Sequence, residues 1–175
     1  MPTLRDRTGV IPDGWTRAES AAEAVDGAKI LLPWSEELTL PEAHPAEMLG
    51  LHVENSVSVE ALRPVLTRVG LISIAFPSFS DGRGFSIAKQ LRGIGFRGRL
   101  RATGPVIADQ FAYLLECGFD EVETPERLDA RQPQPQWDAA LALVSLSYQP
   151  GYPGRRSILD ARRAAQGAAP QGGAA

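Results

Sequence analysis

The chain has 175 residues, of which 43% are apolar and 22% charged, and its formal net charge is −3. This length suits one domain with a real core, and the composition excludes a disordered or fibrous protein. No apolar run reaches the ~18–20 residues that cross a bilayer, and the first residues lack the apolar core of a secretory signal. A pI near 5.4 disfavours a general nucleic-acid binder. One cysteine cannot form an internal disulfide, so we expect a cytoplasmic protein.

Composition divides the chain into three parts. We expect an irregular lead-in over residues 1–27, with at most one short helix. A single α/β domain follows over residues 28–150. Residues 151–175 end in GAAPQGGAA, a composition that buries too little apolar area to offset the entropy of ordering, which predicts a flexible tail.

Inside the domain, short strand-like runs alternate with helical ones. The pattern predicts about five strands, at residues 29–32, 49–53, 71–76, 99–102 and 121–123. It predicts helices at 85–91, 107–117 and 137–146, and a further helix at 57–69 that is interrupted at Pro64. A Gly-Phe pair follows one helix at residue 95 and the next at residue 118. Such repeating units build a parallel sheet with crossover helices, either an open sheet or a partial βα-barrel.

Residues 76–105 form a basic segment in this acidic chain. The segment contains six Arg or Lys residues and one Asp, a net charge of +5, so the rest of the chain carries −8. A local inversion of this size gives one face a potential suited to an anion or an acidic partner.

Two stretches of the segment leave strands that we expect to be parallel neighbours. Ligands of parallel α/β proteins bind beyond the carboxyl ends of the strands, where helix N-termini favour an oxyanion and arginine adds a bidentate clamp. We therefore predict an anion- or partner-binding rim. Its candidate residues are Asp81, Gly82, Arg83, Gly84, Arg101, Thr103, Asp109 and Gln110.

A purely structural interpretation stands beside this one. Asp81 is also an ordinary helix cap, Asp109 suits a first helical turn without any ligand, and the two rim arginines could pair with these aspartates. Residues 97, 99 and 101 are arginines that share one strand face, which is typical of a solvated face. Lys89 and Arg92 are expected to be solvent-exposed helix charges.

The remaining reactive side chains predict little chemistry. His44 and His52 have no metal-ligand spacing, so we expect no metal site. Cys117 lies at a helix end before Gly118, where a small buried side chain is expected rather than a catalytic thiolate. No catalytic residue can be assigned from these patterns.

The basic segment and its continuation resemble a known bacterial family. Residues 79–92 fit the pattern FxDGRGxSxAxxLR, residues 95–104 fit GFxGxLRAxG, and a DQ pair and GFDxFE follow at 109–110 and 118–123. These motifs are similar to domain-of-unknown-function family 934, which is labelled as an oxidoreductase probably involved in sulfite reduction. Val122 stands where the pattern has an aromatic residue.

The basic segment and the resemblance together leave three alternative functions. The first is an accessory protein of assimilatory sulfite or sulfate reduction that uses the rim to bind an oxyanion or a partner, such as sulfite reductase or another sulfur-assimilation enzyme. The second is an oxidoreductase, which would need a bound cofactor of unknown identity because one cysteine and two separated histidines supply no redox chemistry. The third is a structural subunit, in which the motif serves the fold alone.

Overall fold

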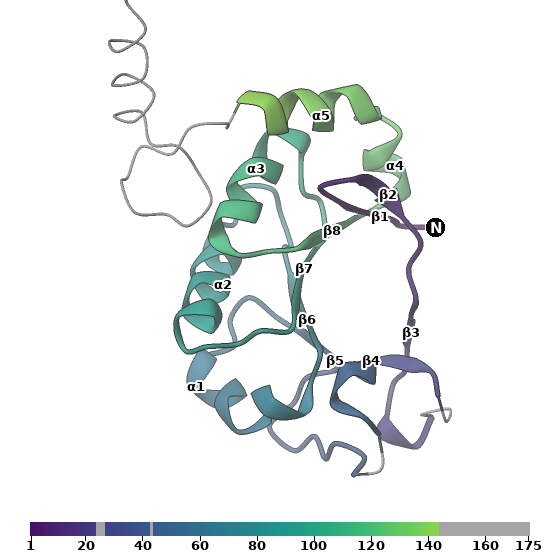
Figure 1. Cartoon of the computed structure of the whole chain (residues 1–175), viewed down its shortest axis with the longest axis vertical. Helices are drawn as coiled ribbons and strands as arrows, with labels where there is room; N and C mark the ends of the chain where they lie inside the picture. The colour runs from purple at the N-terminus through teal and green to yellow at the C-terminus, as the bar shows by residue number, and fades with distance from the viewer. Residues whose placement is uncertain (24–26, 43, 144–175) are drawn as a thin grey trace, which may run out of the picture.

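The computed structural model describes residues 1–23, 27–42 and 44–143. Within them, one mixed sheet has the strand order β2-β1-β8-β7-β6-β5-β4-β3. The strands are β1 (Thr3–Asp6), β2 (Gly9–Ile11), β3 (Trp15–Arg17), β4 (Lys29–Pro33), β5 (Leu49–Val53), β6 (Leu71–Ala75), β7 (Arg99–Thr103) and β8 (Glu121–Thr124). Neighbours from β3 to β8 are parallel, whereas β1 is antiparallel to both of its neighbours. The sheet curls into a half-barrel (Figure 1).

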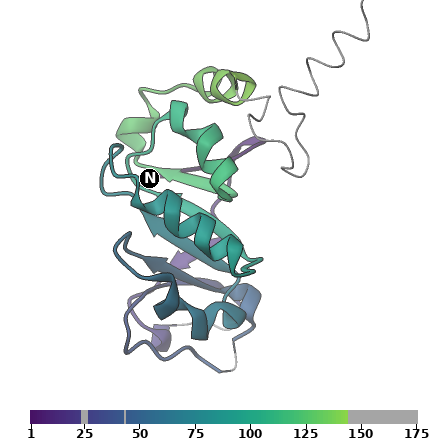
Figure 2. The ribbon, with the colours of Figure 1, turned by 90° about the vertical axis from the view of Figure 1, so that its left-hand side faces the viewer.

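Helices cover the outer face of this curled sheet. They are α1 (Val59–Leu62), α2 (Arg83–Gly93), α3 (Ala108–Cys117), α4 (Glu126–Asp129) and α5 (Gln134–Leu143), with 3-10 turns η1 (Ala21–Glu23), η2 (Ala46–Met48) and η3 (Arg63–Arg68). Figures 1 and 2 show α1, α2 and α3 side by side on one side of the strands. The predicted interruption at Pro64 is confirmed, because α1 gives way to η3 there. The α/β class and the partial barrel are therefore confirmed, with eight strands in the described part of the chain rather than about five.

The apolar core lies between these helices and the outer face of the sheet. Strand side chains alternate between faces, so Ile72 and Ile74 of β6 and Leu100 of β7 enter the core, where each is fully buried. Ser73, which lies between the two isoleucines, and Arg101, which follows Leu100, face the inside of the half-barrel. The sheet thus has an apolar outer face and a strongly polar inner face.

The expectation of an irregular lead-in is wrong, because residues 3–17 contribute three strands. A two-residue turn joins β1 to β2, with the Asp6 carboxylate accepting bonds from the Thr8 backbone N–H and hydroxyl at 2.8 and 2.6 Å. Gly9, at φ +119°, adopts the left-handed region that favours glycine. These strands are only three or four residues long, and β1 and β3 carry charges, so they lack the apolar run that marks a strand in sequence.

The chain itself bridges the open side of the half-barrel. β2 and β3 lie at the opposite ends of the strand order, yet only residues 12–14 separate them in sequence. Four Cα–Cα steps, from residue 11 to residue 15, span at most about 14 Å. The two edges are therefore held close together, and Asp13 lies on the connection between them.

Arg92 ties the two Gly-Phe junctions together. Its guanidinium donates to the backbone oxygens of Phe96, Gly98 and Gly118 at 2.7–3.0 Å and to the Asp120 carboxylate at 2.7 Å. Gly118 ends α3 in the left-handed conformation, as predicted. The interpretation of Arg92 as a solvent charge is wrong, because the sequence repeat places four acceptors around it.

Residues 144–175 lie outside the described part of the chain. The end of the predicted helix 137–146 and the predicted tail 151–175 fall there. The described part of that helix is longer at its start than predicted, since α5 begins at Gln134.

Candidate functional site

The two predicted rim segments meet at one edge of the sheet. One segment connects β6 to α2 and the other connects β7 to α3, and both follow neighbouring parallel strands. The Gln110 side-chain amide, in the first turn of α3, donates to the Phe79 carbonyl at 2.7 Å. Its Oε1 accepts from the Ile107 backbone N–H at 3.3 Å. Gln110 therefore braces the loop before α2 against the start of α3.

Arg83 is paired with Asp81 on the surface. Its Nε and Nη2 lie 3.0 and 2.6 Å from the two carboxylate oxygens, and its backbone N–H donates to the same carboxylate at 3.2 Å. These bonds from Arg83 hold the pKa of Asp81 well below its usual range. The structural expectation of an Asp81–Arg83 pair is confirmed. The arginine side chain is 61% exposed, but its charge is already balanced.

Two motif glycines are required by close packing against Phe76. A Cβ on Gly84 would lie 2.5 Å from the Phe76 ring, and one on Gly104 would lie 2.1 Å from the Phe76 carbonyl oxygen. Gly104 also has φ +137°. A Cβ on Gly82 would meet nothing nearer than 3.8 Å. Part of the motif therefore serves the fold, while Gly82 has no such packing role.

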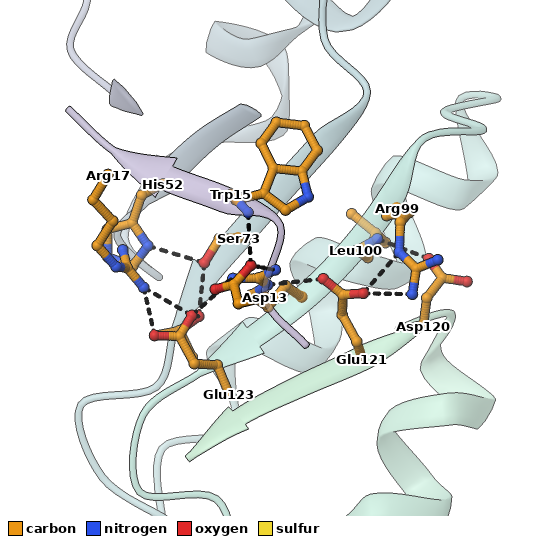
Figure 3. A network of polar contacts seen from close by, with 12 residues as sticks. Asp13, Trp15, Arg17, His52, Ser73, Arg99, Leu100, Asp120, Glu121 and Glu123 are labelled. Carbon is orange, nitrogen blue, oxygen red and sulfur yellow. Dashed lines mark hydrogen bonds and ion pairs between the residues drawn. The ribbon is translucent and has the colours of Figure 1, made fainter. Parts of the chain in front are cut away.

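Arg101 lies away from Arg83 and Asp81, on the inner face of the sheet. Its side chain is 1% exposed, and its guanidinium contacts the carboxylates of Asp13, Glu121 and Glu123. These three carboxylates are labelled in Figure 3. Nε donates to Glu121 at 2.8 Å, Nη1 to Asp13 and Glu123 at 2.8 and 3.0 Å, and Nη2 to Asp13 at 2.9 Å. The expectation that Arg101 shares a solvated face is wrong. Its alternative pairing with Asp109 is wrong too, and Asp109 is exposed at the start of α3.

The carboxylates around Arg101 keep its guanidinium charged although the side chain is buried. Burial alone would lower the pKa of Arg101, but hydrogen bonds from it to Asp13 and the charge of Glu121 raise the pKa above its ordinary value. Burial also acts to raise the pKa of Asp13, yet the Arg101 and Trp15 hydrogen bonds bring the net pKa below its usual range. Both groups therefore stay charged at neutral pH.

A row of polar side chains continues from Glu123 along the inner face. Thr103 Oγ1 donates to Glu123 at 3.5 Å, the Ser73 and Thr103 hydroxyl oxygens lie 2.7 Å apart, and His52 Nδ1 lies 3.0 Å from Ser73 Oγ. Arg17, from β3, donates through Nη2 to both oxygens of Glu123 at 2.7 and 2.8 Å. Four parallel strands and the edge strand β3 thus contribute one connected row. Of the predicted rim residues, Thr103 and Arg101 belong to this row rather than to the surface loop.

A comparison with known protein families shows which family the chain belongs to. The family model described as "Bacterial protein of unknown function (DUF934)" matches residues 50–159, more than half of the chain. The chain belongs to this family. No curated protein matches it, and neither does any solved structure.

The family match and the site do not cover the same residues. Residues His52, Ser73 and Arg101 lie inside the matched range 50–159. Asp13 and Arg17 precede that range and reach the same network from the connection between β2 and β3 and from β3. The inner face is therefore completed by a part of the chain that the family model does not match.

Sequence reasoning missed most of the inner-face residues, namely Asp13, Arg17, His52, Ser73, Glu121 and Glu123. One signal was available for the two glutamates. They alternate on β8 as Arg99 and Arg101 alternate on β7, and the parallel register pairs residue 101 with residue 121. The contribution of Asp13 had no such signal, because it depends on the closure of the sheet.

The other reactive groups have structural roles. Cys117 is buried, as expected, and burial raises the pKa of its thiol. His44 is buried with Nε2 2.9 Å from the Ala28 carbonyl. Across residues 1–23, 27–42 and 44–143, no group of three His, Cys, Asp or Glu side chains could hold a metal ion. No helix in that part of the chain is long and apolar enough to span a membrane.

Proposed function

We propose that this chain is an accessory protein of assimilatory sulfite or sulfate reduction, and that it docks a partner protein through the loop before α2 and the adjoining face of α3. The docking surface consists of Phe79, Arg83, Gln110 and Tyr113. The pathway assignment rests on the sulfite-reduction label of the family that residues 79–123 resemble. The choice of a protein partner rests on the geometry of the loop.

The exposure of Phe79 is the observation that supports docking. Phe79 is the first residue of the family pattern, and its side chain is 60% exposed. Its neighbours are fixed around it, since Gln110 binds its carbonyl and Ser78 binds the hydroxyl and backbone of Ser80. An aromatic ring presented on a braced loop gains most when a partner buries it.

A second exposed ring extends the surface along α3. Tyr113 lies three residues after Gln110, hence on the same helix face, and is 47% exposed. Its ring packs against Phe85, and the Lys89 ammonium lies 5.2 Å from its centre. Aromatic rings beside a lysine suit a partner with an acidic surface.

The geometry favours a protein over a small oxyanion at this place. The Arg83 guanidinium already holds the Asp81 carboxylate in a bidentate pair. The hollow beside it, of about 320 Å³ between α1 and α2, is also lined by Glu60. An anion there would have to displace one carboxylate and approach another.

Affinity capture from sulfate-grown cells tests the proposal. Wild-type protein is expected to retain sulfite reductase or another sulfur-assimilation enzyme, and Phe79→Ser to lose it. Val10→Ser is the matched control, because Val10 is equally exposed, at 61%, but lies on β2. The proposal fails if wild-type protein retains no such enzyme, or if both variants retain it equally.

Growth of a deletion strain separates the accessory function from a structural one. Cells should grow on cysteine but not on sulfate, and the Phe79→Ser gene should fail to restore growth while its product keeps wild-type thermal stability. Loss of solubility in that variant would instead support a structural subunit. An absorption spectrum of the purified protein tests the cofactor-dependent oxidoreductase, which stays a prediction.

A further inference from the structure

The contact between Thr103 and Glu123 gives the hydrogen-bond row on the inner face its direction. A carboxylate only accepts, so the Thr103 hydroxyl, whose oxygen lies 3.5 Å from Glu123, donates its single proton there. Thr103 must then accept from Ser73, 2.7 Å away, which uses the single Ser73 proton. Ser73 must therefore accept from the ring nitrogen 3.0 Å away, so Nδ1 of His52 carries a proton. Glu123 fixes the histidine tautomer through two hydroxyl groups.

This direction leaves Nε2 of neutral His52 as an acceptor. His52 is partly exposed, and its Nε2 has no hydrogen-bond partner among the described residues. Burial and the charges of Arg17 and Arg101 lower the pKa of His52, against the opposing charges of Glu54 and Glu123. The imidazole is therefore neutral at pH 7 and presents a lone pair.

Arg17 offers donors next to this acceptor. Only its Nη2 hydrogen-bonds Glu123, while Nε and Nη1 donate to no described residue and the side chain is 48% exposed. Arg17 and His52 lie next to each other in Figure 3, and both contact the same row, Arg17 through Glu123 and His52 through Ser73. A neutral acceptor beside a cation with unused donors is complementary to a ligand that is negatively charged and still carries a proton.

We propose that His52 and Arg17 form a binding site for a small, partly protonated oxyanion on the inner face of the half-barrel. The ligand O–H donates to His52 Nε2, and its charged oxygens accept from Arg17 Nε and Nη1. The site uses the second half of β5 and the end of β3, where ligands of parallel sheets bind. It shares no residue with the proposed docking surface and does not depend on it.

Hydrogen phosphate and sulfate are the probes that test whether the ligand needs an O–H to donate to His52. They are similar in size and charge, but sulfate has no O–H at pH 7. Inorganic phosphate should shift the His52 Nε2 resonance in long-range ¹H–¹⁵N spectra and should bind at least ~10-fold more tightly than sulfate at equal ionic strength. Equal binding of both anions, or of neither, would overturn the proposal.

Two variants test the mechanism of recognition. Ser73→Ala breaks the row, so His52 should lose the fixed Nδ1–H tautomer and the preference for phosphate. Arg17→Gln should keep the tautomer and lose phosphate binding, whereas Arg63→Gln, an exposed arginine on another face, should keep both. A wild-type spectrum with the proton on Nε2, or unchanged phosphate binding in Arg17→Gln, contradicts the proposal.

Discussion

Arg83 and Arg101 belong to the same basic segment, but their surroundings have almost nothing in common. The Arg83 side chain is 61% exposed and binds one carboxylate two residues away in sequence. The Arg101 side chain is 1% exposed and binds three carboxylates, the farthest of them 88 residues away. An exposed local pair adds little to stability because water screens it and replaces it. A buried network must be complete, since each unpaired charge left inside is costly. The comparison separates a surface available for docking from an interior that holds the fold.

Removing Arg101 should produce the largest effect. Arg101→Ala leaves Asp13, Glu121 and Glu123 without their shared cation, so we expect a loss of about 3–5 kcal/mol in unfolding free energy. Denaturant unfolding measures it, and Arg83→Ala should leave the midpoint unchanged. If Arg101→Ala is too unstable to purify, Arg101→Lys should fold with a lowered midpoint. Equal midpoints for Arg101→Ala and Arg83→Ala would contradict the difference between the buried network and the surface pair.

The motif glycines should divide in the same way. Gly104→Ala places a Cβ 2.1 Å from the Phe76 carbonyl at φ +137°, so about 1–3 kcal/mol of stability should be lost. Gly82→Ala, with nothing nearer than 3.8 Å, is the control and should unfold at the wild-type midpoint. Thermal unfolding of both variants checks this prediction. A wild-type midpoint for Gly104→Ala would contradict it and would mean that the backbone there shifts to make room for the Cβ.

Asp13 should give a smaller, pH-dependent effect. Its pKa is lower in the folded protein than its ordinary value of 3.8. Its contribution is therefore complete above that value and is lost as pH falls through the folded pKa. Asp13→Asn should cost about 1–2 kcal/mol at pH 7, because solvent reaches part of the carboxylate. The difference in unfolding free energy between wild type and variant should stay constant above about pH 4 and shrink below it, and a gap that stays constant at lower pH would contradict the assignment.

His52 should give a milder pH dependence nearer neutrality. Its pKa is lowered from 6.5, so the unfolded chain takes up a proton before the folded protein does, and stability falls as pH drops below about 6.5. His52→Gln should flatten this part of the profile, which thermal unfolding between pH 8 and 5 would record. An unchanged slope in the variant would assign the dependence to another group.

Elements with a strong local pattern could be predicted from the sequence. The parallel strands β4 to β8 and helix α3 were all located to within a residue or two, because each is an apolar or alternating pattern bounded by turn residues. Gly118 was likewise identifiable as the left-handed end of α3. The strands β1 to β3 were missed, since strands this short acquire their stability from pairing with neighbouring strands rather than from their own composition.

The candidate site was predictable only in its surface part. The loop around Phe79 and Arg83 could be placed because the carboxyl ends of neighbouring parallel strands lie at one edge. The inner face could not be found this way. His52 has no metal-ligand spacing, so nothing in the local sequence marks it, and its environment is set by Ser73 and Arg17 from other strands.

The sequence by itself determined the α/β class, the basic segment and the position of its motif loop, because these depend on periodicity, composition and short-range turns. Tertiary structure alone decided what the charge of the segment does. Arg101 became buried because the register of β7 and β8 placed glutamates beside it and the curled sheet brought Asp13 across the opening. Arg83 stayed at the surface because its partner, Asp81, was already its neighbour in the chain. The charge that marks this segment in sequence therefore splits between a surface pair and an interior network, since pairing across the sheet is not encoded locally.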